Sequence, residues 1–100
     1  MKANNMLNQL TFSKDNPVKT MLLQQEHFGL VRIALAKGVI IPPHQGGHAV
    51  FFLVLQGEGI FTCGEEDIKL TPNQHVYIKA DEIRGIQALE DLVVFVVKEH

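Results

Sequence analysis

The chain reads Gly38-Val-Ile-Ile-Pro-Pro-His44-Gln-Gly-Gly-His48 and continues as Ala49-Val-Phe-Phe-Leu-Val-Leu55-Gln-Gly57-Glu-Gly59. A glycine, five residues and a histidine come before an uninterrupted apolar run, and a Gly-x-Gly turn follows it. Glycine adopts the left-handed backbone conformations that tight turns need, so the stretch predicts a β-strand over residues 50–55 held between two turns. Both alternating sets of this strand are apolar, which indicates that both of its faces are covered.

Outward from this stretch, short apolar runs recur about every ten residues, a spacing typical of an all-β sandwich or barrel. Turn residues lie between the runs, among them Pro42-Pro43, Gly46-Gly47 and Pro72-Asn73. We therefore predict an N-terminal arm over residues 1–17, which could supply one strand exchanged within a dimer, and a β-barrel domain over residues 18–100. The expected strands are 19–24, 28–36, 39–41, 50–56, 59–62, 67–70, 76–78, 84–87 and 92–98.

The composition narrows the class of protein. One hundred residues suit one domain. Lys and Arg total 9 against 11 Asp and Glu, with no basic run, so we expect no nucleic-acid partner. No stretch approaches the roughly 20 apolar residues of a membrane span, so we expect no membrane partner. Cys63 is the single cysteine and no leader-like segment is evident, which favours a soluble, cytoplasmic protein.

Several motifs in order resemble those of the cupin superfamily, in particular the small single-domain cupins, over residues 18–97. Gly38 and His44 have the spacing of the first cupin motif, and residues 55–59 form its Leu-x-Gly-x-Gly turn. Residues 70–78 are similar to the family's Pro-Gly-Asp segment, with Gln74-His75 in place of Gly-Asp, and residues 78–86 resemble its second histidine motif. The resemblance implies an all-β double-stranded β-helix, also called a jelly-roll barrel.

The chain departs from this family at the metal ligands. Metal-binding cupins typically use a His-x-His pair, a carboxylate four residues on, and a histidine of the second motif. Here His44 holds the first place, while the other places fall on Gly46, Val50 and Arg84. Glycine and valine offer no ligand, and arginine stays cationic. We therefore expect no metal cofactor.

An alternative keeps a divalent transition metal, bound weakly by His44 and His48. The two residues share strand parity, so both could face inward if this segment is extended. Another interpretation makes both histidines simple hydrogen-bonded groups at the barrel mouth. Arg84 could likewise be structural and paired with a carboxylate, for which the candidates are Asp81, Glu82, Glu58 and Glu90.

Three functions remain open at this stage. The first is a small binding or sensor module with an apolar cavity, in which a small anion or carboxylate is held by His44, His48 and Arg84 beside Val50 and Phe52. The second is a metal-dependent cupin enzyme, a dioxygenase, isomerase or similar, with a non-standard ligand set. The third is a purely structural homodimer. The residues leave open whether any reaction is catalysed.

The sequence also favours a homodimer. Residues 50–55 and 92–97 are apolar on both faces, and a barrel of this size has one interior. The second face of these strands would then pack on another subunit, or under the N-terminal arm of the same chain.

Overall fold

The computed structural model describes residues 3–100, and the regular structure in this part of the chain is entirely β-strand. No helix in the described part could cross a membrane. The all-β fold predicted from the sequence is confirmed, and the strand predicted over residues 50–56 has the same bounds in the structure. The strands are β1 (Val18–Gln24), β2 (Phe28–Leu35), β3 (Ile40–Gln45), β4 (Val50–Gln56), β5 (Gly59–Cys63), β6 (Glu66–Leu70), β7 (His75–Ile78), β8 (Ile83–Ala88) and β9 (Leu92–Glu99).

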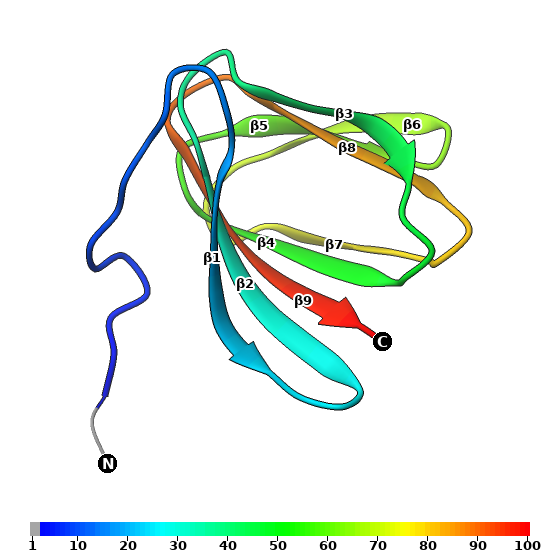
Figure 1. Cartoon of the computed structure of the whole chain (residues 1–100). Helices are drawn as coiled ribbons and strands as arrows, with labels where there is room; N and C mark the ends of the chain where they lie inside the picture. The colour runs from blue at the N-terminus through cyan, green and yellow to red at the C-terminus, as the bar shows by residue number, and fades with distance from the viewer. Residues whose placement is uncertain (1–2) are drawn as a thin grey trace.

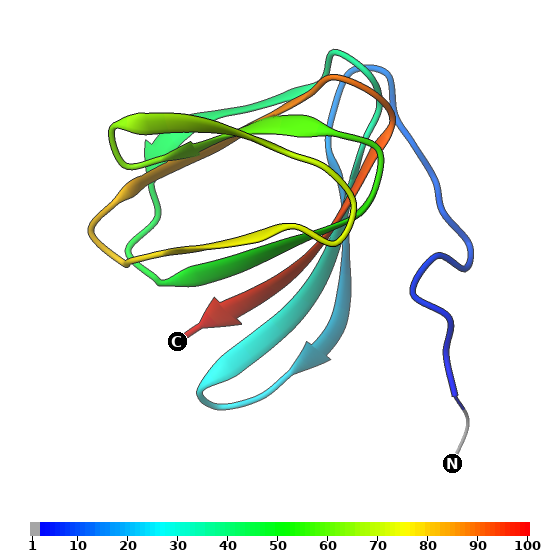
Figure 2. The same ribbon diagram turned by 180° about the vertical axis from the view of Figure 1, so that it is seen from behind.

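The strands form two sheets that enclose one interior (Figures 1 and 2). A five-stranded sheet has the order β1-β2-β9-β4-β7, and a four-stranded sheet has the order β3-β8-β5-β6. Every pairing is antiparallel, and consecutive strands often lie in different sheets. This is the topology of a jelly roll, in which the chain crosses repeatedly between two packed sheets.

The core follows directly from the two-residue period of the strands. In β4, Val50, Phe52 and Val54 face inward and are buried, whereas the alternate residues Phe51 and Leu53 face outward. Facing side chains from the four-stranded sheet complete the interior. Phe61, for example, is fully buried, and its ring centroid lies 5.6 Å from that of Phe52, with the two rings tilted. One contiguous apolar cluster therefore joins the two sheets.

The outer face of the five-stranded sheet is also apolar. Leu53 of β4 lies opposite Phe95 of β9, and Phe51 lies opposite Val97. These four side chains are only half-buried, and the neighbouring Tyr77 of β7 is exposed. The apolar second face inferred from the sequence thus lies on the outside of this sheet.

Strand β3 differs from the prediction, because Pro42 and Pro43 lie within it rather than in a turn. Proline lacks the N–H needed for a sheet ladder and is accepted at sheet edges and bulges. Both conditions hold here, since β3 is an edge strand and its register shifts between Ile41 and His44. The two prolines oppose the single residue Gly85, where an added Cβ would lie 2.9 Å from the Pro43 nitrogen.

This bulge decides where His44 points. Residues three apart on a regular strand lie on opposite faces. The extra residue in the bulge shifts the alternation by one, so Ile41 and the exposed His44 both lie on the side of β3 that faces the other sheet. Cross-strand pairing then sets His44 directly beside Arg84 of β8.

The Gly57-x-Gly59 turn is required by close packing. Gly57 has φ of 76°, and a Cβ there would lie 2.2 Å from the Asp91 carbonyl oxygen. A Cβ at Gly59 would lie 2.8 Å from the Leu92 side chain. Both positions therefore exclude any side chain, which explains the motif in physical terms.

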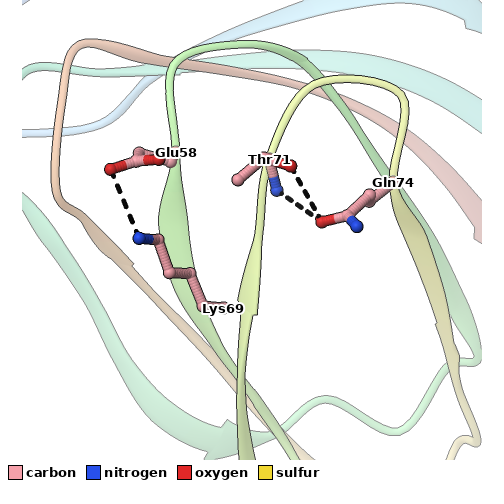
Figure 3. A network of polar contacts seen from close by, with 4 residues as sticks. All are labelled: Glu58, Lys69, Thr71 and Gln74. Atoms are coloured by element: carbon pink, nitrogen blue, oxygen red, sulfur yellow. Dashed lines mark hydrogen bonds and ion pairs between the residues drawn. The ribbon is translucent and has the colours of Figure 1, made fainter.

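The turn between β6 and β7 is closed by its own side chains (Figure 3). Gln74 Oε1 accepts hydrogen bonds from the Thr71 backbone N–H at 2.8 Å and from the Thr71 hydroxyl at 3.0 Å. Asn73 adopts a left-handed φ of 73°, which asparagine tolerates better than most residues. Beside this turn, Lys69 forms an ion pair with Glu58 at 3.5 Å. Gln74 thus stabilises this turn with its side chain, at a place where the sequence departs from the Gly-Asp of the cupin motif.

The N-terminal arm is tied to the outside of β2 by Arg32. This guanidinium is 8% exposed and donates to the carbonyl oxygens of Met6 at 3.0 Å and Asn8 at 2.7 Å, with a longer contact to Gln9. Residues 3–17 form a turn and no strand within this single chain. The exchange of an arm strand between protomers stays a prediction, and residues 1–2 lie outside the described part.

Candidate functional site

A cavity of about 310 Å³ opens between the two sheets. Its volume is at the small end of the range of about 300–1,000 Å³ found for ligand pockets. Residues of β3 and β8 line it on one side and residues of β1, β2, β4 and β9 line it on the other. Apolar side chains make up about half of its lining and are those of Val31, Ile33, Ile41, Val50, Phe52, Ile86 and Val96.

Four of the five residues singled out from the sequence line this cavity. They are His44, Val50, Phe52 and Arg84. The fifth, His48, does not line it, because β3 ends at Gln45 and the turn that follows does not carry the strand alternation forward. Instead, the exposed His48 ring packs edge-to-face on His100, with ring centroids 5.6 Å apart.

His44 is oriented by its own strand. Its Nδ1 lies 2.9 Å from the Pro42 carbonyl oxygen. A carbonyl only accepts hydrogen bonds, so Nδ1 must carry the proton and donate it. In the neutral ring Nε2 is then an acceptor. His44 can therefore accept a hydrogen bond from a bound molecule, or donate one when doubly protonated.

Arg84 is buried, with 4% of its surface exposed, and its charge is held by main-chain oxygens. Nη2 donates to the carbonyl oxygens of Lys79 at 2.9 Å and Glu82 at 3.1 Å, with a longer contact of 3.5 Å to Ala80. Nη1 donates to the carbonyl oxygen of His48. A carboxylate partner was one sequence-based alternative, but no carboxylate in residues 3–100 pairs with this guanidinium.

The remaining guanidinium nitrogen, Nε of Arg84, is buried without a hydrogen-bond partner among the described residues. An unsatisfied buried donor is costly, by about 1–3 kcal/mol. The free energy gained from the other bonds of Arg84 must exceed this cost for the arrangement to persist. Arg84 therefore has a structural role: its hydrogen bonds connect the loop before β8 to the turn before β4.

Gly46 leaves the space that this guanidinium occupies. A Cβ added at Gly46 would lie 3.0 Å from Nη1, 3.1 Å from Cζ and 3.2 Å from Nε of Arg84. These contacts are tighter than ordinary van der Waals distances, and a guanidinium held by three loop carbonyls has little freedom to move away. The glycine and the arginine are thus complementary, and Arg84 fills the volume next to position 46.

The positions that the family resemblance assigns to metal ligands hold few metal donors. The family resemblance assigns ligand places to positions 44, 46, 50 and 84, and the structure brings all four to one cavity. His44 is the single donor among them. Within residues 3–100 no group of three or more His, Cys, Asp and Glu side chains is arranged to hold a metal ion. The buried cation at position 84 would also repel a metal.

Two cationic residues of the cavity were missed from the sequence. Lys19 of β1 and Lys98 of β9 line it together with Arg84, whereas no Asp or Glu does. The strand alternation contains a usable signal, because Lys98 shares the parity of the inward-facing Val94 and Val96. Lys19 gave no such signal, since β1 is exposed along much of its length and its inward face is defined only by pairing with β2.

Cys63, at the end of β5, is not an activated nucleophile. Burial, followed by the negative charges of Glu82, Asp67 and Glu66, raises the pKa of its thiol. A raised pKa lowers the fraction of reactive thiolate at neutral pH. Cys63 also lies outside the cavity, so it has no position from which to act on a molecule bound there.

Comparison with known proteins establishes the architecture. No family model matches this sequence, and no curated protein matches it. Among solved structures, an RmlC-like cupin protein from Desulfovibrio desulfuricans is similar with a TM-score of 0.88 and 24% identity, over 99% of this chain and 96% of that one. A double-stranded β-helix protein from Klebsiella pneumoniae gives a TM-score of 0.86 at 16% identity, covering 99% and 90% of the two chains.

KdgF from a Halomonas species is also similar, with a TM-score of 0.79 and 21% identity over 83% of this chain and 79% of that one. Identities this low show a shared fold and leave function open. The protein therefore has the fold of a small cupin, a double-stranded β-helix, as the motifs of the sequence predict.

Proposed function

We propose that this protein is a small-molecule binding module whose ligand occupies the barrel cavity, and that this ligand is a small anion or carboxylate. The proposal is carried by one observation: the cavity has apolar walls and cationic side chains, with no acidic residue among its lining. An apolar concavity with a few placed polar groups is the usual composition of a ligand site.

The donor set favours binding over metal-dependent catalysis. A metal-dependent cupin enzyme would need several ligands at positions 44, 46, 50 and 84, and His44 alone can serve. The thiol of Cys63 lies outside the cavity. We also propose a cytoplasmic location, for which the lone Cys63 is the support.

Filling the cavity is expected to abolish ligand binding. Val31 lines the cavity and is half-buried, so Val31→Phe adds volume inside it at modest cost to stability. We expect hits from a panel of small carboxylates and phosphates to raise the thermal midpoint of the unmodified protein, since a ligand specific to the native state stabilises it by mass action. The same hits should have no effect on Val31→Phe.

The control is Ile40→Phe, at an exposed apolar position of β3 outside the cavity and outside the five-stranded sheet. It adds the same aromatic ring outside the cavity, so its ligand response should equal that of the unmodified protein. A panel without any hit, or hits that stabilise Val31→Phe as well, would count against binding in the cavity.

We further propose that the protein is a homodimer formed through the outer face of the five-stranded sheet. Half-buried Leu53 and Phe95 lie opposite each other there and belong to the outward alternation, not to the core cluster. Leu53→Lys or Phe95→Lys should therefore weaken the dimer and leave the fold intact, because the added charges would face each other across the interface.

Sedimentation velocity at micromolar concentration measures this directly. The unmodified protein should sediment at twice its 11.2 kDa mass and the lysine variants near 11.2 kDa. Ile40→Lys, at an exposed apolar position of the other sheet, is the control and should remain dimeric. A purely monomeric unmodified protein would contradict the proposal.

A further inference from the structure

Two lysines border the cavity on the five-stranded sheet. Lys19 of β1 pairs with Ile33, and Lys98 of β9 pairs with Val50. Directly paired residues of antiparallel strands project to the same face of the sheet. Because Ile33 and Val50 line the cavity, both lysines lie on its face, in agreement with their own contribution to the lining.

Both ammonium groups lack a fixed partner. Ion pairs within residues 3–100 join His27 to Glu26 and Lys69 to Glu58, and neither involves Lys19 or Lys98. Both lysines are exposed residues, so their apolar stems can cover the cavity wall while their charged ends stay in water. The cavity is therefore bordered by two exposed positive charges that have no ion-pair partner among residues 3–100.

Arg84 has little capacity left for a ligand. Its Nη1 and Nη2 already donate to loop carbonyl oxygens. Its unpartnered Nε is inaccessible to solvent. The guanidinium therefore contributes a fixed positive field inside the cavity, while direct bonds to an anion would have to come from other residues.

From these observations we infer that Lys19 and Lys98 are the specificity-determining residues of the cavity, and that its ligand is a small amphipathic anion. This inference rests on the proposed binding function and names its ligand class. The anionic head lies at the edge of the cavity, within the positive field of the lysines and Arg84, and the apolar body lies against Val50, Phe52 and Val96. The apolar wall of the cavity would bind the apolar body of the ligand, and the two lysines would favour a negatively charged head group.

Probes that share one apolar body and differ in head group test this inference. Hexanoate, hexanamide and hexylammonium can be titrated into the isotope-labelled protein, with cavity resonances followed by NMR. We expect hexanoate to bind about tenfold more tightly than hexanamide, and hexylammonium to bind most weakly. Hexyl phosphate extends the series, and the tighter of the two anions identifies the preferred head group.

Substitution of the lysines assigns the preference to them. Lys19→Met and Lys98→Met should each weaken hexanoate binding by about threefold to fivefold, the size expected for an exposed charge pair, and together by about tenfold or more. Hexanamide binding should be unchanged. The control Lys37→Met removes the same charge from an exposed site outside the cavity and should leave both affinities unchanged.

Salt gives an independent readout. Exposed charges are screened, so raising NaCl from about 0.05 M to about 0.5 M should weaken hexanoate binding and spare hexanamide. Equal affinities for hexanoate and hexanamide, or a preference for hexanoate that survives in the double variant, would overturn the charge assignment while leaving the binding module in place. If none of the probes perturbs a cavity resonance, and the wider panel also gives no hit, then the binding function itself is wrong.

Discussion

Arg84→Met is expected to lower the free energy of unfolding by about 2–4 kcal/mol, one of the largest effects of a single substitution in this chain. Methionine has a similar length but no donors. The carbonyl oxygens of Lys79, Glu82 and His48 would then lose their partner. Charge-assisted bonds of this kind contribute about 1.5–3 kcal/mol each, and removal of a buried charge offsets part of that loss. Urea denaturation measures the change.

Two further substitutions show whether the loss of stability comes from the hydrogen bonds between Arg84 and the loop carbonyl oxygens. Arg84→Lys keeps the charge but lacks the planar fork, so its stability should lie between that of Arg84→Met and the unmodified protein. Arg32→Met is the matched control, because Arg32 is also buried and also donates to main-chain carbonyls. It should release the N-terminal arm and leave the barrel midpoint nearly unchanged. A fully stable Arg84→Met would mean that water satisfies the loop carbonyls.

Much of the fold could be predicted because strands and turns are local features of a sequence. The alternation in β4 fixes which residues face the core, and the Gly57-x-Gly59 pattern marks a tight turn. These signals depend on neighbouring residues only. The order of the motifs then supplied the topology by resemblance.

The failures have a common physical cause, since each depends on contacts between distant segments. Pro42 and Pro43 lie in a strand because β3 is an edge that bulges against Gly85. The same bulge ends the alternation that appeared to join His44 and His48. The sequence suggested an anion or a carboxylate as the partner of Arg84, whereas its partners in the structure are backbone carbonyl oxygens, which have no sequence signature. Edge position and loop packing belong to the folded chain alone.

The triple change Gly46→His, Val50→Glu and Arg84→His is expected to create a transition-metal site around His44, with a dissociation constant of about micromolar or below. The four positions line one cavity. Three imidazoles and one carboxylate suit divalent transition metals, and the change also removes the cation that would repel them. Isothermal titration with Zn²⁺ or Ni²⁺ measures the affinity. Metal analysis of the unmodified protein, purified without added metal, should give well under one equivalent.

The partial variants test the geometry on which this design depends. Gly46→His alone should be strongly destabilising, because its Cβ would lie 3.0 Å from Nη1 of Arg84. The hydrogen bonds of Arg84 to the loop carbonyls prevent the guanidinium from moving away. Adding Arg84→His removes that contact, so the double variant should be more stable than the sum of the two single losses predicts, a positive coupling of about 1–3 kcal/mol.

Metal binding should then restore the stability that is lost with the hydrogen bonds of Arg84. The metal-free triple variant leaves the loop carbonyls without the Arg84 donors and should unfold at a lower midpoint than the unmodified protein. A ligand at about 100 times its dissociation constant adds about 2.7 kcal/mol to the native state, comparable to the cost of losing Arg84. Zn²⁺ should therefore raise the midpoint of the triple variant toward that of the unmodified protein, whose own midpoint should not respond.

A folded triple variant that binds no metal would show that positions 46, 50 and 84 do not converge on His44. Stoichiometric metal in the unmodified protein would show instead that donors other than these four positions form a site.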